Sequence, residues 1–260
     1  MKLKLNLLLV LTVLLLAPSA YTSTPEQRGL EIAQKMENAN NGFLGETSSM
    51  VMTLISAYGQ KTIREMKGKI MEVSDDGDQS LINFQRPSDV KGTKMLTWSH
   101  KRKDDDQWLY LPSMRKTKRI SSKSKTSSFM GSEFSYEDLG SQEIEKYNFK
   151  HIRDEKDIWI LERHPKNKKA SGYSKQIMWV LKRYHNPQKI EYYDRKNELL
   201  KTAEFKNYKS YKIKNKTLWR PSSIHMKNIQ TKKESIFVWK DRKLGLKMKK
   251  RDFSKSSLKR

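Results

Sequence analysis

The sequence predicts a mainly β protein: one antiparallel sheet of about 11 or 12 strands, preceded by a single helix. Segments rich in β-branched and aromatic residues recur from about residue 47 to residue 240, and turn signals such as Tyr58-Gly59 separate them. The connections between consecutive segments are short, which favours antiparallel pairing. A sheet with that many strands must curl strongly or close on itself. We therefore expect a strongly curved β-barrel or half-barrel.

Residues 1–22 are predicted to form a secretory signal peptide. Two lysines precede an apolar run of about 12 residues, and small residues and a proline follow in "APSA". The run is shorter than the roughly 20 residues that span a bilayer. An uncleaved membrane anchor is the alternative. We expect cleavage between residues 17 and 23 and a single exported domain over residues 23–260.

Residues 24–43 are predicted to form the helix. Thr24 can cap its first turn and Pro25 suits the first helical position. Apolar residues recur from Leu30 to Ala39 at largely helical spacing, and Asn40-Asn41-Gly42 ends the pattern. A helix of mixed polarity can pack against the mouth or the concave face of the curved sheet.

Twelve strands are expected after the helix. Their ranges are 48–57, 60–73, 79–85, 93–100, 107–111, 145–152, 156–163, 174–184, 187–194, 198–209, 216–227 and 232–240. Some of them, such as "MVMTLI" (50–55) and "IMWVL" (177–181), are apolar on both faces, whereas a sheet with one wet face should alternate. Either the outer face is covered in places or the concave face is wide and apolar, and the sequence leaves both readings open.

The formal net charge is +25 at pH 7, and there is no cysteine. A charge this large attracts polyanions and anionic surfaces. For an exported protein we expect an anionic membrane surface as the partner and no nucleic acid. General basicity for solubility is the alternative, because lysines are spread along the whole chain. The absence of cysteine excludes a disulfide framework.

No catalytic constellation is visible, so we expect no enzyme, no metal site and no cofactor. The glycines form no G-x-G pair, and no G-x-S-x-G elbow occurs. The five histidines are scattered: His100, His151, His164, His185 and His225. Three carboxylates at Glu133, Glu137 and Asp138 are expected to pair with the basic run at 115–125.

The stretch "SSFMGSEFSYEDLG" (127–140) fits neither a strand nor a helix. It belongs to about thirty residues after Pro112 that have no strong periodicity and include the basic run "RKTKRISSKSK" (115–125). Loops of this length inside a compact domain are usually functional or disordered, and the aromatic residues here disfavour disorder. We therefore expect a functional loop.

Several segments resemble the family of outer membrane lipoprotein-sorting proteins, relatives of the periplasmic lipoprotein carrier LolA. They are "WLYLP" (108–112), "SSFMGSEFSYEDLG", "SLINFQRPSDVKGTKMLTW" (80–98), "PQKIEYYDRKNELLKT" (187–202) and "RDFSKSSLKR" (251–260). The resemblance covers roughly residues 30–258. It implies an incompletely closed antiparallel barrel with helices in its concavity, an apolar concave side that holds acyl chains, and a periplasmic location.

The resemblance also implies a function. Members of this kind carry lipid or lipoprotein cargo, often accompany exporters of the resistance–nodulation–division (RND) type, and are not enzymes. One departure concerns "PSDVKGTKMLTW" (87–98), which contains Lys91 and Gly92 and lacks the Phe-Arg of the "P-x-x-F-R-W" stretch whose arginine latches the lid of the best-known carrier. That latch cannot be transferred to this chain.

The candidate site residues follow from the loop and the resemblance. The candidates for acyl binding or gating are Trp98, Trp108, Tyr110, Phe129, Met130, Phe134, Tyr136 and Trp179. The candidates for contact with anionic headgroups or an acidic partner are Arg115, Lys116, Lys118, Arg119, Lys123 and Lys125. Three alternatives remain. The loop aromatics could be permanent core, the protein could be an adaptor that docks an exporter without binding lipid, or it could be a lipid hydrolase, for which no nucleophile–base pair is visible.

Overall fold

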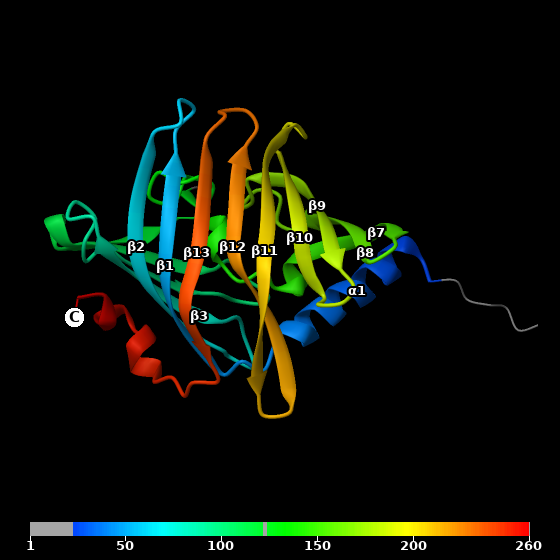
Figure 1. Ribbon diagram of the computed structural model, residues 1–260, viewed down its shortest axis with the longest axis horizontal. Coiled ribbons are helices and arrows are strands. Elements are labelled where there is room, and N and C mark those ends of the chain that lie inside the picture. Colours follow the sequence, from blue (N-terminus) through cyan, green and yellow to red (C-terminus); the bar gives the residue numbers. More distant parts are fainter. Residues whose placement is uncertain (1–22, 122–123, 260) are drawn as a thin grey trace, which may run out of the picture.

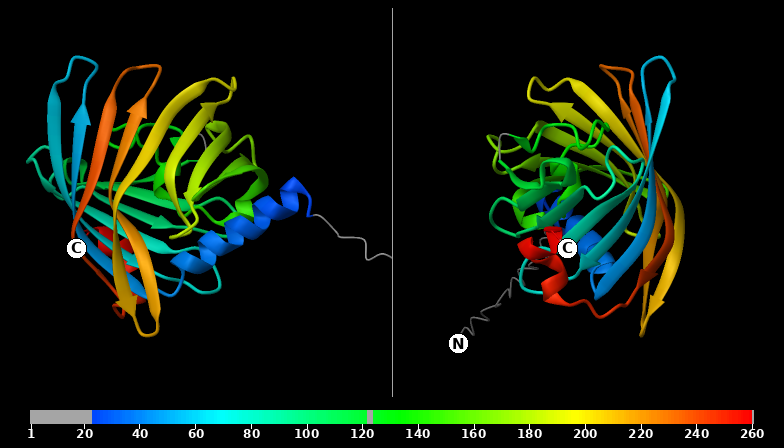
Figure 2. Two further views of the ribbon diagram at one scale, coloured as in Figure 1. Left: turned by 45° about the vertical axis from the view of Figure 1, so that its right-hand side comes forward. Right: turned by 90° about the vertical axis from the view of Figure 1, so that its left-hand side faces the viewer.

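The computed structural model describes residues 23–121 and 124–259, and within them a single 13-stranded antiparallel sheet curves around a concave face (Figure 1). The predicted signal peptide at residues 1–22 and Lys123 lie outside the described residues. Figure 2 shows that the sheet bends strongly without closing into a barrel. The predicted fold class is thereby confirmed.

The element boundaries agree closely with the predicted ranges. The helix is α1 (Pro25–Asn40), and the strands are β1 (Gly45–Ile55), β2 (Lys61–Met71), β3 (Gln79–Arg86), β4 (Lys94–Trp98), β5 (Asp106–Leu111), β6 (Lys116–Ile120), β7 (Tyr147–Glu155), β8 (Ile158–Pro165), β9 (Tyr173–Leu181), β10 (Asn186–Asp194), β11 (Leu199–Ile213), β12 (Lys216–Asn228) and β13 (Glu234–Leu244). Short 3₁₀ helices are η1 (Pro112–Met114), η3 (Glu137–Leu139), η4 (Ile144–Lys146), η5 (Lys250–Phe253) and η6 (Lys255–Lys259). All twelve predicted strands are present, and β6 is the additional one.

The strand order places the first and the last strand in the middle of the sheet. The order is β6-β5-β4-β3-β2-β1-β13-β12-β11-β10-β9-β8-β7, so β1 pairs with β13 and each other neighbour is consecutive in sequence. The two outermost strands, β6 and β7, are joined by the segment that contains the loop at 127–140. This loop therefore lies where the sheet fails to close.

The helix α1 is defined by local signals at its start. The Thr24 side chain accepts a hydrogen bond from the Gln27 backbone while the Gln27 side chain accepts one from the Thr24 backbone, which is a complete capping box. The helix buries Gly29, Ile32 and Ala33 toward the sheet and packs mainly along β7. No helix among the described residues has the length and apolar character needed to cross a membrane.

The two largest parts of the hydrophobic core lie on opposite faces of the sheet. The larger part lies on the concave face, where residues such as Met52, Phe84 and Met226 pack around the loop at 127–140. The smaller part lies on the outer face, where η5 and η6 place Phe253 and Leu258 on the β2–β5 region. This cover explains why β4 and β5 are apolar on both faces, because Met95 and Leu109 belong to the concave part whereas Leu96 and Trp108 belong to the outer part.

Candidate functional site

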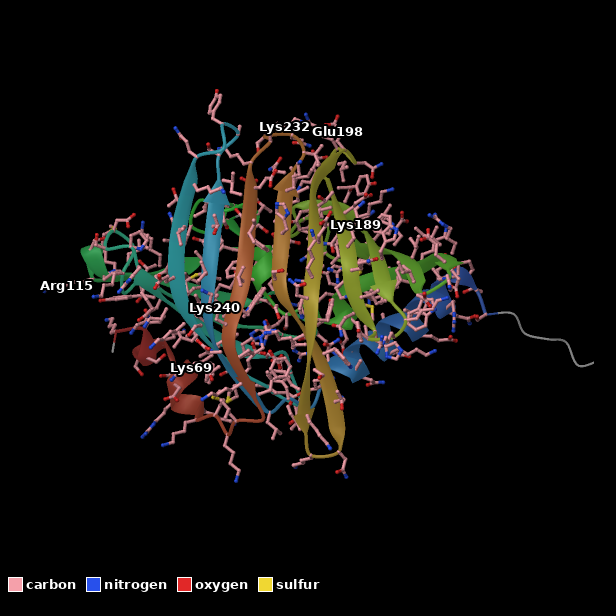
Figure 3. The ribbon with its side chains drawn as sticks, viewed as in Figure 1. Lys69, Arg115, Lys189, Glu198, Lys232 and Lys240 are labelled. Atoms are coloured by element: carbon pink, nitrogen blue, oxygen red, sulfur yellow. The ribbon has the colours of Figure 1, made fainter. Side chains whose placement is uncertain are left out.

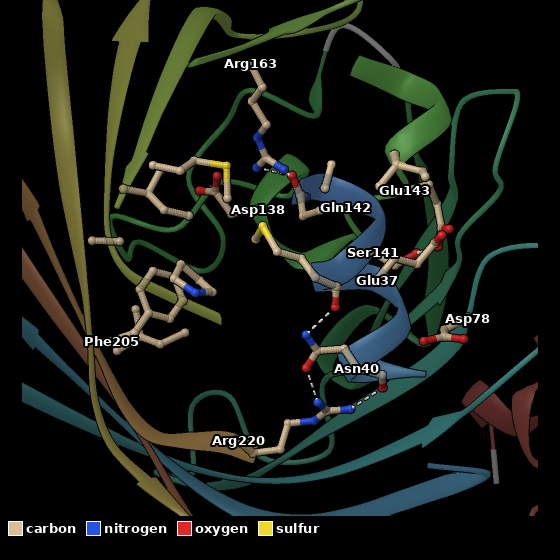
Figure 4. Close-up of a pocket in the computed structure, with 18 of the residues that line it drawn as sticks. Glu37, Asn40, Asp78, Asp138, Ser141, Gln142, Glu143, Arg163, Phe205 and Arg220 are labelled. Carbon is tan, nitrogen blue, oxygen red and sulfur yellow. Dashed lines mark hydrogen bonds between the residues drawn. The ribbon is translucent and has the colours of Figure 1, made fainter. Parts of the chain in front are cut away.

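An apolar cavity of about 370 Å³ opens between α1 and the concave face of strands β7–β12 (Figure 4), and we call it the acyl cavity after the ligand that the family resemblance leads us to expect. Its volume lies within the range of small-molecule pockets. Its apolar wall consists of Ala33, Met36, Phe43, Phe134, Ile144, Phe149, Met178, Pro187, Ile190, Ala203, Phe205, Ile224 and Met226. The helix supplies one side of this wall and the sheet supplies the other.

A second apolar cavity of about 240 Å³ lies toward β1–β3 and β13. Met50, Ile82 and Trp239 belong to its wall. Phe134 and Ile224 line both apolar cavities, so they stand at the partition between them. The ring of Phe134 packs edge-on against Phe237, with 5.1 Å between ring centroids. The Phe134 ring is therefore part of the wall that the two cavities share.

The loop at 127–140 forms a compact plug on the concave face. Ser128 and Ser135 form an isolated β-bridge, and Met130 and Gly131 turn the chain with φ values of 50° and 76°. Phe129 is fully buried, and its ring centroid lies 5.7 Å from the ring centroid of Phe84 and 5.7 Å from that of Tyr136. Arg64 of β2 donates a hydrogen bond to the carbonyl of Met130. The four predicted loop residues are thus brought together within the concave core.

Buried polar contacts hold this plug to strands β9–β12. Lys201 is 3% exposed as a whole residue. Its Nζ lies 2.6 Å from the Asp138 carboxylate and donates to the Glu133 carbonyl at 2.8 Å. The Tyr173 hydroxyl donates to Asp138 at 2.7 Å. Asn228 donates to the Glu133 carboxylate, also at 2.7 Å. Charge pairing of this kind is stabilising only when both partners are present.

The predicted pairing of the loop carboxylates with the basic run is wrong. Glu133 and Asp138 contact β11 and β12, and Glu137 accepts hydrogen bonds from Ser171 and from the Gly172 backbone. Burial raises the pKa of Glu137 above its ordinary value. The loop turns inward after residue 125, so its carboxylates meet strands that are far away in sequence.

The helix α1 is anchored as a cover over the acyl cavity at both of its ends. Near its start, Gly29 lies so close to β7 that an added Cβ would be 2.8 Å from the Lys150 nitrogen. At its end, Arg220 of β12 donates to the side chain and the carbonyl of Asn40, and Lys216 donates to the Asn38 and Asn41 carbonyls. Cations are favourable at a helix C-terminus, where unpaired carbonyls concentrate negative charge.

Carboxylic acids line one side of the acyl cavity's mouth. Figure 4 shows Glu37, Asp78 and Glu143 on the same side. Burial raises the pKa of Asp78 to about 7, and it also raises the pKa values of Glu37 and Glu143. Oxygens of Glu37, Glu143 and Glu145 lie within 4.8 Å of one another, so among the described residues this group could hold a cation. Sequence reasoning missed this group, because Glu37 is distant from the other two in the chain.

Four predicted acyl-binding residues lie on the outer face of the sheet. Trp98, Trp108 and Tyr110 pack against the C-terminal segment, and the Trp98 ring nitrogen donates to the Phe253 carbonyl at 2.7 Å. Trp179 alternates with the concave-facing Met178, and Lys189 lies over its ring at 4.6 Å. Strand periodicity shows which residues share a face but not which face is concave. These four residues are therefore removed from the candidate lining.

The basic run is divided between an edge strand and the interior. Arg115 precedes β6, and the exposed Lys116, Lys118 and Arg119 lie on this outermost strand, where charged side chains discourage pairing with other chains. Lys125 is instead 8% exposed and lies 3.8 Å from Asp104. The labelled cations in Figure 3, which include Arg115 and residues of β2, β10 and β13, are distributed widely over the surface.

Comparisons with known proteins agree with this architecture. A family model described as "Uncharacterized protein" matches residues 76–260, and no curated protein matches the chain. A solved domain from Vibrio parahaemolyticus, described as a proposed outer membrane lipoprotein-sorting protein domain, is 44% identical, with a TM-score of 0.86 over 90% of this chain and 100% of that chain.

Two further solved structures are similar to this chain. A DUF1329 family protein from Desulfovibrio piger is 30% identical, with a TM-score of 0.83 over 91% of this chain and 100% of that chain. A LolA superfamily protein from Nitrosomonas europaea is 19% identical, with a TM-score of 0.68 over 88% of this chain and 98% of that chain. At 19% identity, the last comparison shows the shared fold alone.

Proposed function

Because this chain belongs to the outer membrane lipoprotein-sorting protein family, with the LolA-like fold, we propose that it is a periplasmic carrier of lipid or lipoprotein acyl chains. The observation that carries the proposal is the acyl cavity between α1 and the concave face of the sheet. Acyl chains offer no polar group to recognise, so their binding depends on apolar area, at about 25 cal/mol for each Å² buried.

The helix α1 is the element that opens in this proposal. Its buried face is small, with Gly29, Ile32 and Ala33 as its buried residues, and Arg220 and Lys216 hold its C-terminal end. The plug at 127–140 has a buried ion pair with β11 and hydrogen bonds from β9 and β12, so its displacement costs more than a swing of α1. In this proposal Arg220 of β12 fixes the closed state by holding the C-terminal end of α1. Its position in the chain is unrelated to that of Lys91 and Gly92, in the region that corresponds to the latch of the best-known carrier.

Phe134 adjusts the cavity to its cargo in this proposal. It stands between the two apolar cavities, and Met36, Met178 and Met226 line the acyl cavity beside it. Methionine adapts its shape to irregular ligands because it is unbranched and flexible. Rotation of Phe134 would lengthen the acyl cavity toward β1 and β13, which suits a long chain.

The basic surface provides the finer part of the proposal. Lys116, Lys118 and Arg119 on β6 would meet anionic headgroups of a membrane surface, or an acidic face of an RND-type exporter that supplies the cargo. Both interactions are electrostatic, so they should weaken as the ionic strength rises.

An adaptor that docks a transporter without binding lipid is the second candidate. The observation that favours it is the fully buried Phe129, because an adaptor needs a filled concave face and not a cavity that opens. The two functions differ in whether lipid accompanies the purified protein.

The decisive experiment is organic extraction and mass spectrometry of the mature protein, purified gently from its export compartment. A carrier should contain stoichiometric acyl lipid. The variant Ala203→Phe should lose this lipid, because Ala203 is fully buried in the wall of the acyl cavity. Its control is Ala57→Phe at an exposed turn. A lipid-free, folded protein that still captures a transporter would favour the adaptor.

A further inference from the structure

A second, polar pocket of about 440 Å³ lies where the two ends of the sheet approach each other, and we call it the polar pocket. Residues 101–105 and Gln107 line it from the β4–β5 end, and residues 165–167, Ala170 and Ser171 line it from the end of β8. Lys125, Tyr136 and Glu137 of the connecting segment form another wall.

The polar pocket carries more positive than negative groups. Its cations are Lys101, Arg102, Lys103, Lys125, Lys146 and Lys166, and its carboxylates are Asp104, Asp105, Glu137 and Glu145. Lys125 pairs with Asp104, and Lys146 pairs with Asp105. The exposed cations Arg102, Lys103 and Lys166 have no carboxylate within 4 Å among the described residues. These three can bind a phosphate without breaking an existing ion pair.

The pocket also contains acceptors that lack a donor. Gln107 is 1% exposed, and its amide nitrogen donates to the Tyr136 carbonyl at 2.9 Å. The Gln107 Oε1 and the Glu145 Oε2 are buried and have no hydrogen-bond partner among the described residues. A buried acceptor left unpaired is costly, so a ligand that donates N–H or O–H groups would be favoured here.

The polar pocket and the acyl cavity are adjacent. Ser141 and Gln142 line both of them. The carboxylates of Glu37 and Glu143 border the acyl cavity, that of Glu145 borders the polar pocket, and all three come within 4.8 Å of one another. A single amphiphile could therefore occupy both spaces and present a cationic group to the carboxylates at their junction.

We propose that the polar pocket binds the headgroup of the amphiphile whose acyl chains fill the acyl cavity, and that this headgroup combines a phosphate with an ammonium group. This inference rests on the proposed carrier function. Arg102, Lys103 and Lys166 hold the phosphate. The ammonium group donates to Glu145 and Gln107 and neutralises the three clustered carboxylates. Phosphatidylethanolamine has this chemistry.

The test is displacement of a fluorescent fatty acid, cis-parinaric acid, from the mature protein by three short-chain lipids. These are the dihexanoyl forms of phosphatidylethanolamine, phosphatidylglycerol and diglyceride. We expect phosphatidylethanolamine to compete at least tenfold better than diglyceride and better than phosphatidylglycerol. Equal competition by all three lipids, or a preference for phosphatidylglycerol, would overturn the headgroup assignment while leaving the carrier intact. Failure of the probe itself to bind would instead refute the carrier.

Variants and a soluble headgroup complete the test. The pair Arg102→Glu and Lys103→Glu, and separately Glu145→Gln, should each reduce the phosphatidylethanolamine preference at least fivefold while parinaric acid still binds. The control is Lys209→Glu with Lys212→Glu on the exposed part of β11. An unchanged preference in the pocket variants would contradict the proposal. Binding of free O-phosphoethanolamine as tight as that of the lipid would also contradict the proposal, because the ligand would then be a small solute.

Discussion

Replacing Lys201 by methionine should destabilise the protein by about 3 kcal/mol. The Lys201 Nζ lies 2.6 Å from Asp138, and the two side chains are 4% and 5% exposed. Removing one member of a buried pair typically costs about 3–5 kcal/mol, because the remaining charge is left unpaired. The lower end applies here, since Ser135 and Tyr173 still donate to Asp138 at 2.7 Å each. Urea unfolding followed by tryptophan fluorescence measures the change.

A matched control and a double-mutant cycle make this prediction specific. Lys206→Met removes an exposed cation from the same strand, where it pairs with Glu204, and should change stability by less than about 0.5 kcal/mol. Lys201→Met combined with Asp138→Asn should recover about 2 kcal/mol relative to the sum of the single changes. Equal effects of Lys201→Met and Lys206→Met, or additive changes in the cycle, would show that the plug is not held by this pair.

Three further predictions concern the cavity and its covers. Asp78→Asn should stabilise the protein by about 2 kcal/mol at pH 8 and by little at pH 4, as measured by urea unfolding at each pH. The pKa of Asp78 is raised to about 7, so the wild type loses stability as the pH rises from about 4 to 7. A shift of this size corresponds to roughly 4 kcal/mol, and we take half of it because the Asp78 side chain is partly exposed. An identical pH profile in both proteins would refute this. Gly29→Ala should speed hydrogen exchange in α1, because its Cβ would meet the Lys150 backbone at 2.8 Å; slower exchange would mean that helix propensity dominates. Phe134→Ala should cost about 3–5 kcal/mol in urea unfolding and increase the bound acyl lipid per protein, whereas unchanged lipid content would exclude Phe134 as the partition.

The strands could be predicted because their local chemistry matches their environment. Segments such as β8 and β9 combine β-branched and aromatic residues with clear turn signals, and both were found within two or three residues of their observed ends. The strand β6 (Lys116–Ile120) was missed because "KTKRI" has almost no apolar character. It forms through backbone pairing with β5, in which Lys116 lies opposite Leu111 and Ile120 lies opposite Gln107. This tertiary context overrides the weak strand propensity of the segment.

The site was only partly predictable, since it depends on which face and which distant residue each side chain meets. The loop aromatics Phe129 and Phe134 were found from an unusual motif, and both lie on the concave face. Trp108 has an equally strong aromatic signal but faces the C-terminal segment, and alternation alone cannot distinguish these outcomes. The contact between Asp138 and Lys201 spans 63 residues and has no local signature.

The pairing of β1 with β13 has a consequence for how the chain acquires its structure. Val51 lies opposite Val238, so the centre of the sheet joins residues from the beginning and the end of the folded region. Contacts between residues so distant in sequence slow folding, because a large loop must close before the contact stabilises anything. Strands β1–β6 and β7–β12 can each form a local meander earlier, but the two halves become continuous only when β13 is available. A chain truncated before Glu234 should therefore remain as two separate, protease-sensitive half-sheets, and the complete chain should acquire resistance in one late step.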